Sequence, residues 1–411
     1  MPEFKFYDSP HEFEPLRLEM DEALLSKAEA LVTSAAKLKG NVHGRVYPAM
    51  ADLVRGMNCY YSNLIEGHKT LPLDIEKALR NEYSKDQQIH DLQKLAVAHI
   101  RAEKALQEVV DKGSDPAAPE FLKTAHRIFC EALPESMLVL SDGSKLIPGV
   151  WRTKEVKVGR HVPPRRDSIP AFLERFHAVF ADLKPGMQSV VPIAIAHHRL
   201  AWIHPFADGN GRVARLMTDA MLRRYGINEH GLWSLSRGFA KTADNYKAYL
   251  TSADEPRCGD LDGRGNLSTS TLREFVLYLL STAVDQVEYM TSLFELPTLS
   301  SRIDAYIAQA RRELRPESAK LLKQALAAGE LDRGELASIT GLHERIARDV
   351  ARQLLAEGML VSDSPRGMLR ISFPAKVLGW YFPNLYPAGA DDQIEKPEVK
   401  GKARRPRRRP S

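Results

Sequence analysis

One short stretch in the middle of the chain decides how the rest is interpreted: Ile203-His204-Pro205-Phe206-Ala207-Asp208-Gly209-Asn210-Gly211-Arg212-Val213-Ala214-Arg215. The apolar run Val190–Ile203 predicts a helix that delivers His204 into a turn. The glycines on either side of Asn210 allow successive backbone N–H groups to converge on an anion. A helix that starts there adds unpaired N–H groups and positive potential. The stretch therefore predicts a polyphosphate-binding site.

Four side chains of this stretch add chemistry to the predicted site. Arg212 and Arg215 are three residues apart, so both lie on one face of the first helical turns. Asp208 is the one acid of the loop, and a carboxylate beside phosphates indicates a bridging Mg²⁺. His204 can take up a proton near neutral pH and act as a general base. The stretch is not a Walker loop, because G-x-x-x-x-G-K-[ST] is absent.

At every fixed position the stretch matches H-x-F-x-[D/E]-G-N-G-R-x-x-R, and it resembles this motif of the Fic-domain family. The resemblance covers about residues 60–375. Residues 149–164 resemble the family's flap hairpin, and residues 259–275 resemble the helix that follows its core. The fold that this resemblance implies is mainly α: a Fic-type helical bundle with a β-hairpin flap, plus a C-terminal winged-helix domain.

The resemblance also implies an activity, protein adenylyltransferase, in which AMP passes from ATP to a Ser, Thr or Tyr hydroxyl with release of pyrophosphate. His204 would deprotonate the hydroxyl, and Asp208 would hold Mg²⁺. The flap would cover the nucleotide and pair with the backbone of the target protein. Tyr246 would line the adenine pocket, unless it is an ordinary core aromatic. The implied ATP-binding residues are Gly209, Asn210, Gly211, Arg212, Val213, Ala214, Arg215, Val158, Gly159, Arg160, His161 and Tyr246.

A second motif, Ser62-Asn-Leu-Ile-Glu66-Gly67, resembles the family's inhibitory sequence [S/T]-x-x-x-E-[G/N]. In such proteins the glutamate pairs with the second arginine of the core, here Arg215. An arginine bonded to a carboxylate cannot also grip the γ phosphate. The resemblance therefore implies autoinhibition. The alternative is a surface glutamate near a helix end that is followed by a glycine cap.

Apolar periodicity predicts the helices of the bundle. They are expected at about Glu19–Leu38 (ended by Gly40), Tyr47–Asn63, Asp86–Asp111, Ala118–Ala132, Ser168–Leu183, Pro192–Ile203, Asn210–Tyr225 and within 267–315. Alternation of polar and apolar residues over Glu155–Gly159 predicts one short hairpin among them.

The C-terminal region has a pattern of its own. The pattern predicts a winged helix, which consists of three helices followed by two strands. The helices are expected near Pro316–Ala328, Arg333–Thr340 and His343–Glu357, and the strands near Met359–Ser362 and Leu369–Ser372. The third helix carries acidic residues as well as Arg345, Arg348 and Arg352, whereas a groove-reading helix should be more uniformly basic. Protein contact or oligomerisation, as in a homodimer, is therefore preferred to DNA binding. Three alternatives to the adenylyltransferase function remain: a DNA-binding regulator, a toxin-like protein, and removal of AMP by the same site.

Composition shows where the positive charge lies. The 411 residues include 58 Lys and Arg against 53 Asp and Glu, but residues 400–411 hold seven of the basic ones, which leaves 51 against 53. Such a run is expected to be disordered, and it could hold nucleic acid or an anionic surface. The predicted parts are an N-terminal helical region with the inhibitory motif (1–115), a Fic core (116–300), the winged helix (301–385) and a basic tail (386–411).

The remaining features concern location and partners. Cys59, Cys130 and Cys258 are far apart in sequence and fit no zinc or disulfide pattern, which favours a reducing, cytoplasmic compartment. No apolar stretch approaches 18 residues, and the N-terminus is acidic, so neither a membrane span nor a secretory signal is expected. The expected partners are ATP and a protein substrate, which includes the chain itself through auto-AMPylation.

Overall fold

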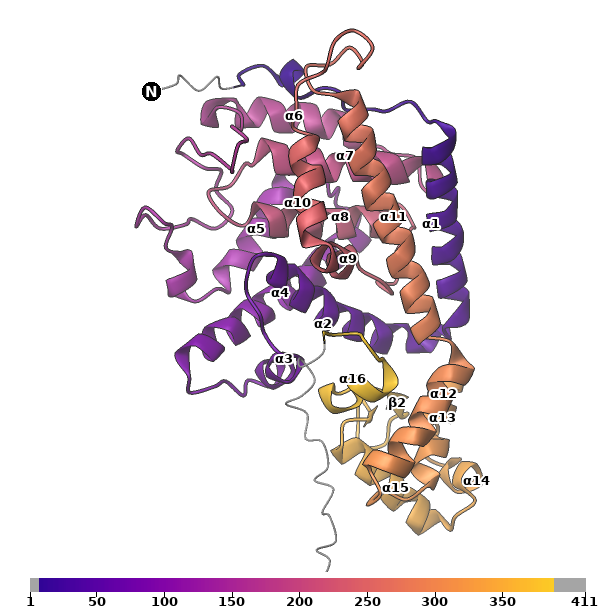
Figure 1. The fold of residues 1–411 in the computed structure, drawn as a ribbon. Helices are drawn as coiled ribbons and strands as arrows, with labels where there is room; N and C mark the ends of the chain where they lie inside the picture. The colour runs from indigo at the N-terminus through magenta and orange to yellow at the C-terminus, as the bar shows by residue number, and fades with distance from the viewer. Residues whose placement is uncertain (1–6, 388–411) are drawn as a thin grey trace, which may run out of the picture.

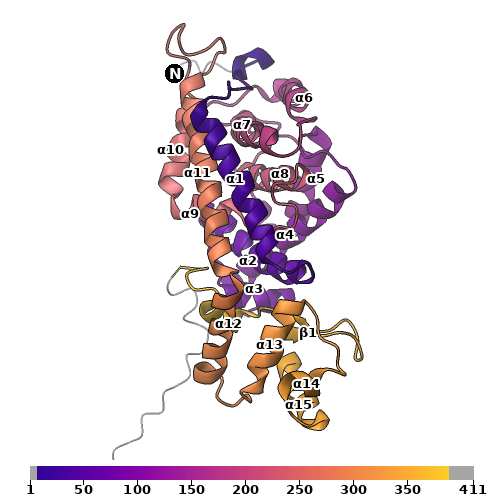
Figure 2. The ribbon, with the colours of Figure 1, turned by 90° about the vertical axis from the view of Figure 1, so that its right-hand side faces the viewer.

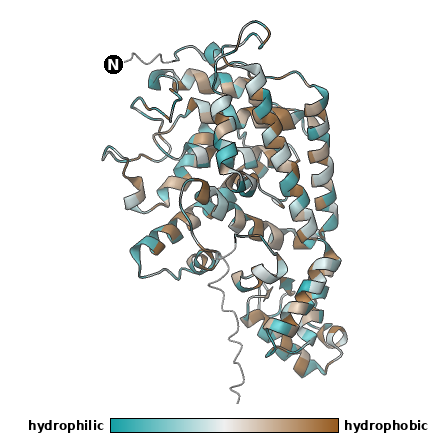
Figure 3. Ribbon diagram, viewed as in Figure 1, coloured by the Kyte–Doolittle hydropathy of each residue, from teal (hydrophilic) through white to brown (hydrophobic). Residues whose placement is uncertain are grey.

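Helix α7 (Met187–Ile203) lies at the centre of the computed structural model, which describes residues 7–387 (Figure 1). Nearly every residue of α7 from Ser189 onward is buried, because a helix that is apolar on all sides must be surrounded by protein. Helices α6 (Ile169–Phe180), α8 (Asn210–Arg224) and α11 (Thr269–Leu293) pack against it. Figure 3 shows hydrophobic residues along the helices at the centre of this bundle.

The other helices of the bundle come from two successive parts of the chain. The N-terminal part contributes α1 (Glu22–Asn41), α2 (Tyr47–Ile65), α3 (Pro72–Leu79) and α4 (Gln87–Asp111). The following part adds α5 (Pro119–Glu131), α9 (Leu235–Lys241) and α10 (Ala243–Ser252). Short 3₁₀ turns occur at Pro10–Phe13, Gly44–Val46, Glu135–Leu138 and Arg166–Ser168. The prediction of a mainly helical protein is confirmed.

The long helices α1 and α11 lie side by side along one edge of the bundle (Figures 1 and 2). The carboxylate of Asp21 caps α1 by accepting the Leu24 N–H at 3.0 Å, and it also pairs with Arg273 on α11. This cap explains why α1 begins at Glu22 and not at Glu19. The expected stop at Gly40 is wrong, because α1 continues to Asn41.

Several local predictions are corrected by the structure. Helices α3, α9, α10 and α16 (Ala375–Tyr381) were missed, since segments of 7 to 10 residues carry little periodic signal. The expected flap hairpin contains no strand: one isolated bridge joins Val158 to His161. The segment has no further strand to pair with, so alternation of residue types alone did not produce a ladder there.

The C-terminal region contains the predicted three helices and two strands in the predicted order. They are α13 (Glu317–Ala328), α14 (Leu336–Thr340), α15 (Glu344–Ala356), β1 (Leu360–Val361) and β2 (Arg370–Ile371). The strands are antiparallel, with Leu360 opposite Ile371, and a bridge from Leu331 to Leu369 ties the α13–α14 loop to them. Membership in the winged-helix class stays a prediction.

The predicted boundary at residue 301 is too late. It falls inside α12 (Leu296–Ala305), which continues into a π-helical turn at Tyr306–Ala310 and packs on α13 and α16. The division therefore lies between α11 and α12, where the C-terminal region begins below the bundle in Figure 1.

The predicted start of the tail at residue 386 is also corrected. Tyr386 is buried and stacks on Tyr61 of α2, and the Tyr61 hydroxyl donates to the Leu385 carbonyl at 2.9 Å. The folded part thus includes Tyr386, and the rest of the predicted basic tail, 388–411, lies outside the described residues. Among residues 7–387, no helix is both long and apolar enough to cross a membrane.

Candidate active site

The turn between α7 and α8 has an unusual backbone. His204 ends α7 with φ 50° and ψ 58°, a left-handed conformation that costs a non-glycine residue roughly 1 kcal/mol or more. Its N–H still donates to Leu200 O at 3.1 Å, and Arg152 Nε donates to its carbonyl at 3.0 Å. The contacts on both sides hold His204 in the strained geometry, and its side chain lines a cavity of about 750 Å³.

The surroundings of His204 shift the pKa of its imidazole. Burial is the largest cause, and with the charges of His161 and Arg152 it lowers the pKa of His204 to about 4. The neutral form therefore dominates at pH 7, and this form can accept a proton. The role of His204 as the general base stays a prediction.

This low pKa is directly testable. We expect the NMR signal of the His204 ring to stay in its neutral form from pH 8 down to pH 6, because the proton is taken up only as the pH falls towards about 4. Titration of the full chain with labelled histidine measures it, and a His204→Ala sample assigns the signal. A midpoint near 6.5, the value of an exposed histidine, would show that the ring is not desolvated.

The glycines of the turn create the start of α8. Gly209 has φ 80° and serves as N-cap, and its carbonyl accepts the Val213 N–H at 3.0 Å. The N–H groups of the first residues of α8 therefore have no partner within the helix. Asn210 has a different role from the expected one: its side chain accepts from Phe206 N–H and donates to Phe206 O, both at 2.9 Å. Because its side-chain amide is used on Phe206, Asn210 would contact a phosphate through its backbone N–H.

Glu66 and Ser62 reach the same helix from α2. The Arg215 guanidinium donates to Glu66 Oε1 at 2.6 Å, to Ser62 Oγ at 2.9 Å and to Ser62 O at 3.1 Å. Burial raises the pKa of Glu66, but the charge and hydrogen bond of Arg215 outweigh this and hold the pKa below its usual value. Glu66 is therefore ionised at neutral pH, and two guanidinium nitrogens of Arg215, Nε and Nη2, donate to residues of the second motif.

Two glycines make this contact possible. Gly67 follows the end of α2 with φ 84°, which lets the chain turn away directly after Glu66. Gly211 faces Glu66, and a Cβ there would lie 2.5 Å from Glu66 Oε1. The bare backbone of Gly211 thus leaves room for the Glu66 carboxylate beside the start of α8.

The cavity gathers many, but not all, of the predicted residues. Those that line it are Glu66, Gly67, Val158, His161, His204, Asn210, Gly211, Ala214, Arg215 and Tyr246. Asp208 stands outside the lining with its carboxylate 56% exposed. Arg212 packs over the Phe129 ring at 4.9 Å, and Val213 is buried in the core. Ser62 is not part of the lining, but its Oγ accepts a hydrogen bond from Arg215, which is. Gly159 and Arg160 lie at the turn of the flap, outside the lining.

Tyr246 is a core aromatic that also lines the cavity, and its contact with adenine stays a prediction. It is buried and stacks on Phe239 with the ring centroids 4.2 Å apart, as a core aromatic does, yet it also lines the cavity. Its hydroxyl contacts His197 at 2.8 Å. His197 reaches Thr218 on α8 at 2.7 Å through its other ring nitrogen. Tyr246 therefore braces α8 from beneath the cavity.

The flap is attached to the site through groups that the sequence did not indicate. His161 Nε2 donates to Trp202 O at 2.7 Å, and Asp254 lies 3.8 Å from its other ring nitrogen. Arg152 binds the Lys154 and Pro164 carbonyls at the two ends of the flap. Trp202 and Asp254 lie far from the flap in sequence and belong to no motif, so only the fold could reveal them as partners of His161.

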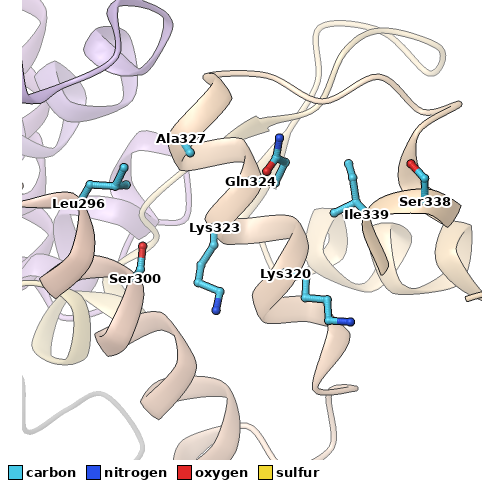
Figure 4. Close-up of a pocket in the computed structure, with 8 residues that line it drawn as sticks. All are labelled: Leu296, Ser300, Lys320, Lys323, Gln324, Ala327, Ser338 and Ile339. Carbon is cyan, nitrogen blue, oxygen red and sulfur yellow. The ribbon is translucent and has the colours of Figure 1, made fainter. Parts of the chain in front are cut away.

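A second hollow lies in the C-terminal region between α12, α13 and α14 (Figure 4). Its volume is about 540 Å³. Both of its lysines are engaged, Lys323 with Asp304 at 2.7 Å and Lys320 with Thr340 O at 3.2 Å. This hollow contains neither a base nor an anion nest, so the cavity at His204 is the candidate active site.

Comparison with known proteins agrees with this geometry. Residues 116–222 match the Fic/DOC family, so the chain contains a Fic domain. A Drosophila virilis relative named protein adenylyltransferase Fic is 39% identical over 79 residues, which are 19% of this chain and 16% of that protein. A Nematostella vectensis relative of the same name is 36% identical over 90 residues, 22% of this chain and 21% of that protein. This chain thus matches only about a fifth or less of the length of these relatives.

A solved structure shares the fold over a longer range. The crystal structure of a Fic family protein from Desulfovibrio desulfuricans superposes with a TM-score of 0.51 at 18% identity. The superposition covers 89% of this chain and 98% of that one. The similarity therefore concerns the fold of both the bundle and much of the C-terminal region.

Proposed function

We propose that this protein is an adenylyltransferase that moves AMP from ATP to a Ser, Thr or Tyr hydroxyl of a protein, itself included. The observation that carries the proposal is one cavity of about 750 Å³ in which His204 lies with Arg215 and the start of α8. Relatives named protein adenylyltransferase Fic support this choice of reaction.

Each group of the cavity has a part in this reaction. The His204 imidazole accepts the proton of the attacking hydroxyl, whose oxygen bonds to the α phosphorus of ATP. The bond between that phosphorus and the bridging oxygen breaks, and pyrophosphate leaves. The N–H groups at the start of α8, together with Arg215, stabilise the charge that develops on the β and γ phosphates. The resemblance gives the same role to Arg212, although Arg212 lies outside the lining and packs over Phe129.

Asp208 fits the role of a magnesium ligand. Its Oδ1 accepts the Gly209 N–H at 2.6 Å, and its carboxylate is otherwise largely exposed. Within residues 7–387 there is no cluster of three or more side chains that could hold a metal by themselves. Mg²⁺ often binds through one or two carboxylates and the phosphates of a substrate, so a single aspartate is sufficient. When bound, the ion would neutralise phosphate charge.

The contact between Glu66 and Arg215 supports a second part of the proposal, autoinhibition. Arg215 uses its guanidinium donors on Glu66 and Ser62 and cannot offer the same donors to a γ phosphate. ATP would then bind with its phosphates displaced from the reactive line, and such misplacement costs about 10²-fold in rate.

One labelling experiment tests the reaction itself. Full-length protein with Glu66→Gly is incubated with Mg²⁺ and ATP labelled either at the α or at the γ phosphate. AMP transfer puts the α label into protein and leaves the γ label in pyrophosphate. Incorporation of the γ label instead would identify phosphoryl transfer and contradict the proposal.

Ser62 offers a graded test of the autoinhibitory contact. Ser62→Ala removes one charge-assisted hydrogen bond to Arg215 but leaves Glu66 in place. Because Glu66 still holds Arg215, we expect a change at the low end of what such a bond contributes, about 1.5 kcal/mol, so AMP incorporation should rise by roughly tenfold, less than in Glu66→Gly. Initial rates with α-labelled ATP measure the ranking. An incorporation rate equal to wild type would show that Ser62 has no part in the restraint.

The DNA-binding alternative has less support on α15. Arg348 pairs with Glu344 at 2.9 Å and Arg352 with Asp349 at 2.7 Å, so acids of the same helix balance two of the three predicted cations. Salt-dependent retention on DNA tests this alternative, and growth of cells that express Glu66→Gly tests a toxin-like role. A homodimer, AMP removal and a cytoplasmic location stay predictions.

A further inference from the structure

We propose that His126 on α5 is a positioning residue of the active-site loop. It holds the Asp208–Gly209 peptide group, and with it the Asp208 carboxylate and the start of α8, in the orientation that the reaction needs. The proposal rests on the function proposed above for this site, and no sequence motif singles out His126.

Both ring nitrogens of the buried His126 are used. The Gly149 N–H, at the base of the flap, donates to His126 Nδ1 at 2.8 Å. Nδ1 therefore carries no hydrogen, and the neutral ring carries its proton on Nε2. That nitrogen lies 3.2 Å from the Asp208 carbonyl, to which it donates, and 3.4 Å from the Cys130 thiol. One imidazole thus joins the flap to the active-site loop.

The ring also fills the space beside the loop. It stacks on Phe206 with the ring centroids 3.9 Å apart and an interplanar angle of 7°. At Gly209 a Cβ would lie 3.5 Å from His126 Cδ2, so the imidazole packs directly against the left-handed residue that caps α8. The hydrogen bonds and the stacking restrain the same loop, residues 204–209 between α7 and α8, from one side.

The consequence for the site follows from the planar peptide bond. Because the Asp208 carbonyl points towards His126, the Gly209 N–H of that peptide points the opposite way. This N–H donates to Asp208 Oδ1 at 2.6 Å and so orients the carboxylate. The Gly209 carbonyl in turn accepts the first hydrogen bond of α8, from Val213 N–H. His126 therefore acts on substrate only through the loop.

Two substitutions at this position separate positioning from packing, each made in the full-length Glu66→Gly protein. His126→Phe keeps a flat ring against Phe206 and removes both hydrogen bonds. His126→Gln removes the ring but provides an amide with one acceptor and one donor. We expect His126→Phe to lower kcat/KM for ATP by about 10- to 100-fold, as partners that orient metal ligands do, and His126→Gln to recover most of this loss.

Two further measurements complete the test. Thermal melting reports the packing role, and calorimetry of ATP with Mg²⁺ reports binding without turnover. If His126 is a positioning residue, kcat/KM and ATP affinity should be lower in His126→Phe than in His126→Gln, because only the amide can form the hydrogen bonds. Tm should be higher in His126→Phe, because only that variant keeps a ring against Phe206. A fall in kcat/KM that parallels Tm in both variants, or an unchanged kcat/KM and ATP affinity in His126→Phe, would overturn the proposal. If Glu66→Gly transfers no AMP at all, the function proposed for the site fails, whereas the ATP affinities still test His126.

Discussion

Glu66→Gly is expected to raise incorporation of α-labelled AMP into the protein itself by about 100-fold. The substitution removes the carboxylate that binds the Arg215 guanidinium at 2.6 Å, and it frees those donors for the γ phosphate of ATP. It also widens the space in front of Gly211, where Glu66 Oε1 now lies. Autoradiography of the purified full-length protein over a time course measures the change.

Two control variants make this result specific. Glu131→Gly removes a glutamate from the last turn of α5 that is 55% exposed and that, among residues 7–387, pairs only with Arg127 of the same helix, so it should leave incorporation unchanged. Arg215→Ala added to Glu66→Gly should abolish the gain, because the freed guanidinium is itself the group that acts. If Glu66→Gly incorporates no more AMP than wild type or Glu131→Gly, the contact does not restrain the enzyme.

His204→Ala in the Glu66→Gly protein is expected to lower AMP transfer by about 10²- to 10⁴-fold, the usual contribution of a general base. ATP should still bind, because Arg215 and the backbone N–H groups at the start of α8 stay in place. Initial rates with α-labelled ATP measure transfer, and calorimetry measures ATP affinity. A loss of both together would instead indicate that the loop had collapsed.

A second variant at this position controls for the backbone. His204 has φ 50°, a conformation that alanine adopts at a cost and asparagine tolerates better. His204→Asn should therefore lose transfer as fully as His204→Ala while it keeps more of the thermal stability. Substantial transfer by either variant would remove His204 from the mechanism.

The predicted site depended on residues that are close in sequence. His204, Gly211 and Arg215 belong to one turn and the helix after it, so spacing alone indicated that they share a site, and they line one cavity. The role of Glu66 required a resemblance, because nothing in residues 62–67 shows which arginine the glutamate meets 149 positions later. The contact is present; its inhibitory effect stays a prediction.

Other parts of the site could not be predicted from the sequence. The Asn210 side chain uses its amide on the Phe206 backbone, although Asn210 also lines the cavity, and the tight turn between α7 and α8 sets this arrangement. The flap lacks the strands that alternation suggested, since a strand needs a partner as well as a suitable residue pattern.

The helical class of the protein and the chemistry of the turn at 204–215 could be predicted from the residues alone, because periodicity and close spacing are local properties of a chain. The distant groups that complete the site became apparent only in the folded structure. His126 and Arg152 act on the loop through hydrogen bonds to backbone carbonyls. Every residue has such a carbonyl, so these partners become visible only once the chain has folded.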